Sequence, residues 1–314
     1  MGQSLLPPQP VIYLVEPFGG SIRRQNPTMP HIFWDDAAVT RGDGIFETIL
    51  IRGGRPVNLD KHLERFRRSA AALDLPDPGR DHWVTATMEA VGDFLREHGG
   101  ENAGDAGGVT DAVCVWTMTR GRESTGVPTA WLTVRPPNPE FARQRKRGVK
   151  AMTTGRGYTI DREDTGGTGV PWLSLGAKTL NYAATMAALR WARQNGFDDV
   201  IYIDPATGRV LEGATSTVLV VKKGNRLRTP EAGPDILPGT TVRALFEHAE
   251  PRGWRCKTKP LYVDDLRSAE SVWLLSSVRR GVRVTHLDGE ELKTPGNVKE
   301  IAKLIDASLA APAD

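Results

Sequence analysis

The sequence predicts an α+β protein with two domains. Its 314 residues exceed the ~100–150 residues of a typical single domain. The β-rich segments follow one another in hairpin-linked groups, and helical segments separate these groups. A doubly wound dehydrogenase would alternate strands and helices strictly, so the observed order favours the α+β class.

The N-terminal half is predicted to contain strands and two helices. Residues 11–15 and 45–51 are rich in β-forming residues, and the sequence RGGRP that follows is typical of a hairpin turn before a short strand at VNL. Asp60 is expected to cap a helix over residues 61–73, where apolar residues recur at helical spacing. The further expected elements are a helix over 81–98 and strands over 112–121, 129–136 and 149–154.

The C-terminal half is predicted to begin with a helix within residues 173–196, which Gly196 ends. The basic stretch RQRKRG, at residues 143–148, is interpreted as a solvated turn. The remaining expected elements are strands within 198–230, a turn and helix at 236–253, strands with a short helix at 254–289, and a last helix at 298–310.

A Gly-rich polar segment at residues 156–172 is the best candidate for a connection between the domains. The expected division is therefore an N-terminal α+β domain of residues 1–155 and a C-terminal α+β domain of residues 173–314. The second of these would carry the candidate catalytic lysine described below.

Composition and motifs argue against several classes of function. Lys and Arg number 41 against 38 Asp and Glu, and a net charge of +3 gives no reason to expect a nucleic-acid partner. Cys114 and Cys256 are too few for a disulfide scaffold or a cysteine-based metal site, and the six histidines are not at metal-ligand spacing. There is no GxGxxG or GxSxG motif, and GAKT at 176–179 lacks the Gly before Lys that a P-loop needs.

The sequence has no apolar run long enough to span a bilayer. Its first ten residues, MGQSLLPPQP, lack the basic region and the apolar core of a secretory leader. We therefore expect a cytoplasmic protein without a membrane partner and without a metal.

Lys178 is the first candidate for chemistry. It precedes or begins an apolar-rich helix, and its neighbours include Leu175, Ala177, Leu180 and Tyr182. A lysine against apolar walls has a lowered pKa, because desolvation disfavours the ammonium form, and a neutral amine can attack a carbonyl group. The alternative is a lysine at a helix end whose ammonium group reaches water.

Three further sites could complement such a lysine. The guanidinium fork of Arg65 suits a phosphate, and a helix N-terminus at Thr240 and Thr241 offers N–H groups and hydroxyls to an anion. Glu212 follows a predicted strand, where a carboxylate could pair with a protonated ring nitrogen. The alternatives are a solvated basic helix face, an ordinary Thr-capped helix and an exposed acid. Together, an amine, an anion site and an acid are the components of a pyridoxal phosphate site.

Five blocks of the sequence resemble, in their residues and in their order along the chain, the motifs of fold-type IV pyridoxal-phosphate enzymes. This group includes branched-chain aminotransferases, D-amino-acid aminotransferases and 4-amino-4-deoxychorismate lyases. The resemblance extends from about residue 31 to about residue 290. The blocks are GDGIFETI (42–49), HLERFRRSA (62–70), AKTLNYAATMAAL (177–189), VLEGATSTVLVV (210–221) and ILPGTTVRAL (236–245).

The resemblance implies a role for each matching residue. Lys178 would bind pyridoxal 5'-phosphate (PLP) covalently and move the substrate proton, and Glu212 would face the pyridine nitrogen. Arg65 would bind the cofactor phosphate. The other residues expected to bind the cofactor are Thr217, Gly239, Thr240, Thr241 and Ser277. The resemblance also implies two domains with the cofactor between them, in a homodimer.

The sequence departs from the family at one position. Relatives often have Glu-Gly-x-x-x-Asn, whereas this chain has Thr217 in place of the Asn. Thr217 retains a hydrogen-bonding group, so the resemblance implies a preserved site with altered surroundings. Tyr182 is a further candidate for contact with the cofactor ring.

The sequence, especially GAKTLNYAATMAALR and SSVRRGVRV, looks most like 4-amino-4-deoxychorismate lyases. This resemblance implies the elimination of pyruvate to leave 4-aminobenzoate, in folate biosynthesis. The lyase substrate has two carboxylates, and several arginines are available for them. The alternative is an aminotransferase acting on D-amino acids or branched-chain amino acids, although the Arg-x-His pair frequent in D-amino-acid aminotransferases is absent after residue 119. The candidate substrate-binding residues are Glu47, Arg120, Arg122 and Arg279.

Overall fold

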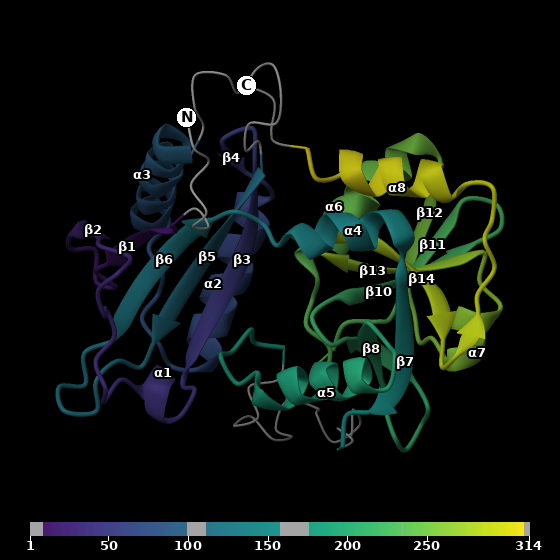
Figure 1. Cartoon of the computed structure of the whole chain (residues 1–314), viewed down its shortest axis with the longest axis horizontal. Coiled ribbons are helices and arrows are strands. Elements are labelled where there is room, and N and C mark those ends of the chain that lie inside the picture. The colour runs from purple at the N-terminus through teal and green to yellow at the C-terminus, as the bar shows by residue number, and fades with distance from the viewer. Residues whose placement is uncertain (1–8, 99–110, 158–175, 234, 311–314) are drawn as a thin grey trace, which may run out of the picture. The chain divides into compact units, whose positions relative to one another are not determined.

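A computed structural model of the chain describes residues 9–98, 111–157, 176–233 and 235–310. The described residues form two compact units (Figure 1). The first unit takes the residues up to Asn138 together with Ala177–Asn181, and the second begins at Pro139 and includes Tyr182–Ala310. Both contain a sheet and helices, so the predicted α+β class is confirmed.

The division of the chain differs from the predicted one in two respects. The first unit ends at Asn138 instead of residue 155, because β7 (Val149–Gly155) pairs with strands of the second unit. The segment Ala177–Asn181, which includes Lys178, packs with the first unit although it was assigned to the C-terminal domain. Apart from Arg156 and Gly157, the predicted connection at residues 156–172 lies outside the described residues.

The first unit contains a six-stranded sheet in the order β2-β1-β6-β5-β3-β4, with every neighbouring pair antiparallel. Helix α2 (Leu59–Ala72) packs on β3, and helix α3 (Arg80–His98) packs on β1 and β6 (Figure 1). The other bounds are β1 Val11–Val15, β2 Ile22–Gln25, α1 Ala37–Thr40, β3 Gly44–Arg52, β4 Arg55–Pro56, β5 Asp111–Thr119 and β6 Thr129–Arg135.

Side-chain alternation along β3 separates two faces of this sheet. Ile45, Ile49 and Ile51 join the hydrophobic core beneath α2 and α3, so Glu47 belongs to the same face. Phe46, at an even position, belongs to the opposite face. The core beneath the helices is centred on an aromatic cluster of Phe66, Trp83 and Trp116.

The second unit contains a nine-stranded sheet in the order β12-β11-β10-β13-β14-β7-β8-β9, with β15 pairing to β14. It is a mixed sheet, because β7 runs parallel to β8 and β14, and β11 runs parallel to β12. The bounds not yet given are β8 Asp199–Ile203, β9 Val210–Gly213, β10 Thr217–Lys222, β11 Arg226–Thr229, β12 Arg255–Thr258, β13 Ser271–Ser276, β14 Arg280–Leu287 and β15 Glu290–Glu291.

The helices of the second unit cover its sheet through separate apolar clusters. Helices α6 (Thr240–Ala249) and α8 (Val298–Ala307) share a core with β10 and β13, and α5 (Ala183–Gln194) packs on β8 (Figure 1). The remaining helices are α4 Pro139–Arg147, the 3-10 turn η2 Glu250–Arg252 and α7 Val263–Arg267. None of the helices in the described part of the chain has the length and apolarity needed to cross a bilayer.

Three local predictions were wrong. The basic stretch is the end of helix α4, where Arg147 pairs with Glu140, about two helical turns away, and with Asp198. Helix α2 begins at Leu59 after Asn58, whose left-handed backbone (φ 55°) leads directly from the turn into the helix, so no strand forms at VNL. Asp60 therefore lies in the first turn of α2, where its charge still opposes the positive end of the helix dipole.

Candidate active site

The segment around Lys178 is extended and adds to the edge of the first sheet. Phe46 donates its backbone N–H to the carbonyl of Lys178 at 3.0 Å, and Leu180 donates to the carbonyl of Gly44 at 2.8 Å. The backbone N–H of Lys178 in turn donates to Ser69 Oγ on α2 at 3.0 Å. Helix α5 begins only at Ala183, so Lys178 precedes the helix, and its segment is joined to β3 by an isolated β-bridge between Ile45 and Thr179.

Gly44 lies where β3 closely approaches β5. A Cβ atom at Gly44 would lie 2.8 Å from the backbone carbonyl oxygen of Met118 and 2.8 Å from Leu180 Cδ1, which is closer than van der Waals contact allows. The Leu180 methyl group could turn aside, but the Met118 backbone belongs to β5. A side chain at position 44 would therefore disturb the pairing of β3 with β5, which gives a physical reason for Gly44 in the GDGIFETI block.

The side chain of Lys178 lies over an aromatic ring. Its Nζ is 4.1 Å from the centroid of the Phe46 ring, which is within the range of a cation–π contact. Phe46 itself belongs to the face of the sheet opposite α2. The apolar wall predicted for Lys178 is thus supplied in part by Phe46.

Glu47, Arg65 and His62 form a buried cluster on the other face of β3. Arg65 donates from Nε to Glu47 Oε1 at 2.6 Å and from Nη2 to Oε2 at 2.7 Å. His62 Nδ1 is 2.7 Å from the same Oε2. The side-chain exposures of Glu47, His62 and Arg65 are 0%, 1% and 8%, so the whole cluster is removed from solvent.

The charges within this cluster are fixed by its geometry. Burial alone would raise the pKa of Glu47, but the Arg65 guanidinium and the hydrogen bonds from Arg65 and His62 lower it to about 2. Burial lowers the pKa of His62 and outweighs the attraction of Glu47. Glu47 is therefore ionised and His62 neutral near pH 7, which places the single ring proton of His62 on Nδ1, where it donates to Glu47.

The arginines predicted to bind substrate carboxylates are all engaged by acids of their own unit. In the first unit, Arg120 pairs with Asp43 at 3.2 Å and donates to two backbone carbonyls of the α2–α3 connection. Arg122 pairs with Asp35 at 3.0 Å. In the second unit, Arg279 pairs with the buried Asp199 at 2.6 Å. Their role toward substrate stays a prediction.

Glu212, at the end of β9 in the second unit, is held by an arginine that the sequence did not reveal. Arg156, directly after β7, donates from Nη2 to Glu212 Oε1 at 2.8 Å and from Nη1 to the carbonyl of Asp235. The backbone N–H of Leu237 donates to Glu212 Oε2 at 3.3 Å. The guanidinium also lies over the Tyr202 ring, 5.7 Å from its centroid.

Arg156 has no local sequence signal, since it belongs to a Gly-rich polar stretch and its partner is 56 positions away. The pairing depends on the parallel alignment of β7 and β8 and on the antiparallel alignment of β8 and β9. Two strand pairings must therefore be known before Arg156 can be placed beside Glu212.

The start of α6 gathers the predicted anion-binding residues. Gly239 is the N-cap, and the first N–H groups of a helix have no acceptor within the helix. Thr240 Oγ1 and Ser277 Oγ lie 3.5 Å apart. Helix dipole, N–H groups and hydroxyls together suit a phosphate.

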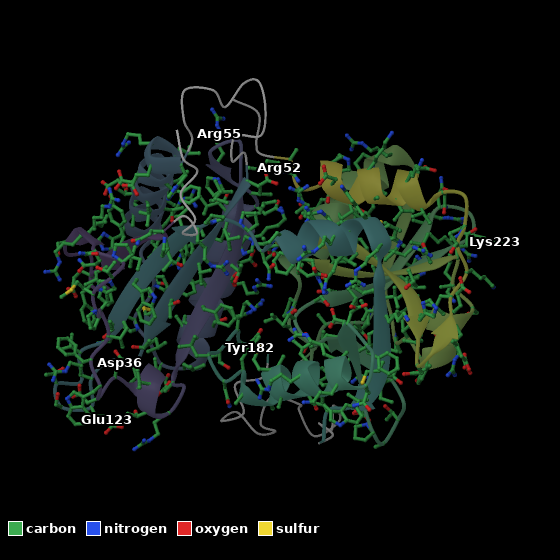
Figure 2. The ribbon with its side chains drawn as sticks, viewed as in Figure 1. Asp36, Arg52, Arg55, Glu123, Tyr182 and Lys223 are labelled. Atoms are coloured by element: carbon green, nitrogen blue, oxygen red, sulfur yellow. The ribbon has the colours of Figure 1, made fainter. Side chains whose placement is uncertain are left out.

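Thr217, the departure from the family pattern, packs against this helix start. A Cβ atom at Gly239 would lie 2.3 Å from Thr217 Oγ1, so any side chain there would force Thr217 to move. Thr217 is thus a neighbour of the anion-binding turn. Tyr182, the N-cap residue of α5, also belongs to the second unit (Figure 2).

Within the described ranges, no group of three or more His, Cys, Asp or Glu side chains is placed so that it could hold a metal ion. Both cysteines are free thiols, and burial raises the pKa of Cys114 to about 12 and, with help from the charge of Glu250, that of Cys256 to about 11. Neither thiol is suited to act as a thiolate nucleophile at neutral pH.

Comparison with known proteins identifies the family. The amino-transferase class IV family matches residues 44–287, which include Lys178, Glu212 and the anion-binding turn. The chain belongs to this family. The family resemblance of the sequence blocks is therefore confirmed.

Two further relatives support this assignment over nearly the whole chain. A bifunctional aminodeoxychorismate lyase / D-amino acid transaminase of Mycobacterium tuberculosis is 38% identical over 291 residues, which are 91% of this chain and 96% of the relative. The structure of a hypothetical aminotransferase from Mycobacterium tuberculosis in its PLP-bound form is 36% identical, with a TM-score of 0.84 over 96% of this chain and 99% of that chain.

The solved structure of a fold IV-transaminase from Curtobacterium pusillum is 35% identical in sequence to this chain, and the two structures superpose with a TM-score of 0.84. The alignment covers 97% of this chain and 100% of that chain. The predicted fold-type IV architecture is therefore confirmed.

Proposed function

We propose that the protein is a PLP-dependent enzyme whose main reaction is that of a 4-amino-4-deoxychorismate lyase. The observation that carries this proposal is the near full-length similarity to a protein named for that activity. The same relative is also named as a D-amino acid transaminase, so transamination of D-amino acids is the second candidate. Both reactions begin with removal of a proton from the carbon that bears the substrate amine.

The described residues fit the chemical groups of PLP. Lys178 supplies a primary amine for the aldehyde, and Glu212 supplies a carboxylate that can accept a hydrogen bond from the protonated pyridine nitrogen. Gly239, Thr240 and Ser277 supply the donors of a phosphate cradle, and Arg65 supplies a guanidinium.

When bound, PLP holds the substrate amine covalently and withdraws electrons from the carbon that carries it. Lys178 would take up the proton from this carbon, because its Nζ is a free amine once the substrate amine has taken its place. Glu212 supports the positive charge of the pyridine ring, and Arg156 keeps the Glu212 carboxylate oriented. In the lyase reaction, removal of this proton would accompany cleavage of the bond to the enolpyruvyl group, which takes up a proton and leaves as pyruvate. In transamination, Lys178 would return the proton to a different carbon.

The substrate pocket would have to hold carboxylates, and the arginines of the first unit are the proposed source. Arg120 and Arg122 follow β5, and their side chains are 42% and 31% exposed. Arg279 belongs to the second unit, where it pairs with the buried Asp199, and it stays a candidate for substrate binding. We propose that the enzyme acts as a homodimer, as the family resemblance implies, and that it is cytoplasmic, as the sequence predicts.

The decisive experiment supplies aminodeoxychorismate to the purified enzyme with PLP and measures 4-aminobenzoate and pyruvate. Parallel reactions contain D-Ala or L-Leu with 2-oxoglutarate. We expect aminobenzoate formation in the first reaction and slower amino-group transfer from D-Ala. Amino transfer without any aminobenzoate would reject the lyase, and transfer from L-Leu alone would indicate a branched-chain aminotransferase.

Two lysine variants test the role of Lys178. We expect Lys178→Ala to lose both activities and the absorbance of covalently bound cofactor. Lys223→Ala is the matched control, because Lys223 lies in the exposed turn after β10 at the surface of the second unit (Figure 2). A Lys178→Ala variant that retains both activities would refute the proposed function.

A further inference from the structure

Glu47 was predicted as a substrate-binding residue, but its surroundings indicate a different role. Its carboxylate is fully buried, and both oxygens accept hydrogen bonds from side chains of α2. A substrate carboxylate or amine that approached Glu47 would have to displace Arg65 or His62. The carboxylate is therefore committed to the protein itself.

The contacts of Glu47 determine the orientation of the Arg65 guanidinium. Two parallel hydrogen bonds, from Nε and Nη2, fix the plane of the guanidinium as well as its position. A single hydrogen bond would leave rotation about the contact possible. The geometry thus holds Arg65 in one orientation before any ligand binds.

The backbone elements that carry the cluster make this orientation rigid. Glu47 lies in the middle of β3, where its register with Trp116 of β5 is fixed by a ladder of nine paired positions. His62 and Arg65 are three positions apart on α2, so both side chains reach the same carboxylate. A strand and a helix therefore locate the three side chains together.

We propose that Glu47 and His62 are positioning residues that hold the Arg65 guanidinium for the cofactor phosphate. This inference rests on the proposed function, in which Arg65 binds that phosphate. Glu47 sets the plane of the guanidinium, and neutral His62 donates to Glu47 Oε2 and prevents the carboxylate from rotating away. Neither residue needs to contact substrate.

The test compares two ligands that differ only in the phosphate. The full-length protein, freed of cofactor, is titrated with PLP and with pyridoxal, and dissociation constants are measured by tryptophan fluorescence. Glu47→Asp keeps the charge that compensates Arg65 but is one methylene shorter, so it moves the guanidinium. We expect the dissociation constant for PLP to rise about tenfold and that for pyridoxal to stay the same.

Two additional variants keep the test informative if one of them does not fold. Glu47→Gln retains the size of the side chain but removes the charge. His62→Asn leaves the net charge unchanged, because His62 is neutral, and removes the ring that supports Glu47. Both are expected to weaken PLP binding selectively, with the smaller effect for His62→Asn. Circular dichroism identifies the variants that fold.

The matched control is another acid–arginine pair on the same helix. Arg67 donates from Nε and Nη2 to Asp77 at 2.6 and 2.5 Å, but this pair is exposed. Asp77→Asn should bind both ligands as the unaltered protein does. Equal losses of PLP and pyridoxal affinity in folded Glu47 variants would show a purely structural role and overturn the inference, as would unchanged affinities.

Arg65→Lys separates failure of the inference from failure of the proposed function. If the protein does not prefer PLP over pyridoxal, or if Arg65→Lys leaves that preference unchanged, the phosphate role of Arg65 is wrong. If Arg65→Lys abolishes the preference and the Glu47 and His62 variants do not reduce it, only the positioning role is wrong.

Discussion

The two acid–arginine pairs of the candidate site differ in their exposure to solvent. In the first unit, Glu47 and Arg65 are buried to 0% and 8% exposure, and both carboxylate oxygens are occupied by α2. In the second unit, Arg156 and Glu212 are 12% and 23% exposed, and Arg156 contacts Glu212 through a single nitrogen. The first pair is part of a core, whereas the second is at the end of a strand.

This difference indicates which charged group of each pair serves the ligand. The Glu47 carboxylate is enclosed, so under the proposed function it would orient Arg65. The Glu212 carboxylate is more accessible than its arginine, so there the arginine would orient the acid. The two units would then use the same kind of ion pair in opposite senses, and each of the following predictions tests that contrast.

The largest effect is expected for the stability of Glu47→Gln. Removing one partner of a buried ion pair leaves the other charge without compensation, which costs about 3–5 kcal/mol. Urea unfolding at pH 7 measures the loss. The double variant Glu47→Gln/Arg65→Gln should recover part of it, because no buried charge is left. A loss as small as that of a surface substitution would show that the cluster is not buried as described.

Glu212→Gln is expected to affect catalysis more than folding. Its carboxylate is partly exposed, so the loss of unfolding free energy should be smaller than for Glu47→Gln. Removing the charge that supports the pyridine ring should lower kcat about 10²–10³-fold. Steady-state kinetics on folded protein measures this change, and full activity in the variant would contradict the role assigned to Glu212.

Acid pH is expected to weaken the first unit through the same cluster. The pKa of Glu47 falls from its ordinary 4.5 to about 2 on folding, so its stabilising contribution is complete above pH 4.5 and is lost as pH falls towards 2. The shift corresponds to about 3 kcal/mol. The lowered pKa of His62 acts in the same direction, with loss of stability as pH falls below 6.5. Unfolding free energies of Glu47→Gln should therefore vary less between pH 4.5 and 2 than those of the unaltered protein.

The smallest effect is expected for Asp77→Asn. Its bidentate contact with Arg67 resembles that of Glu47 with Arg65, but both side chains are more than half exposed. Solvent and salt screen such a pair, so the thermal midpoint should not change measurably. A clear decrease in the midpoint would mean that bidentate geometry matters more than burial.

Many residues of the candidate site could be predicted from the sequence, because they occur in short motifs of adjacent residues. Lys178, Glu212 and the Gly239–Thr241 turn are each recognisable from a few neighbouring residues, and the family they indicate is confirmed. Periodicity also located most helices and strands. It failed at α4, where charged residues hid a helix that is stabilised by Glu140 and Asp198.

The contacts among these residues could not be predicted in the same way. Lys178 was expected beside its sequence neighbours, yet its backbone pairs with β3, more than a hundred positions away. Glu47 was predicted to bind substrate. The alternation of residues along β3 does not show that α2 covers the face of the strand on which Glu47 lies. Arg156 was not recognised at all, because two strand pairings separate it from Glu212.

By itself, the sequence determined the α+β class, the family and the identity of the groups available for chemistry. These depend on local periodicity and on blocks of adjacent residues, which are written directly in the chain. Only the tertiary structure decided that the Lys178 segment joins the first unit, that Glu47 holds Arg65 and that Arg156 holds Glu212. Such pairings arise from strand register and helix packing between distant segments, and burial then decides which charge of a pair is fixed and which remains accessible.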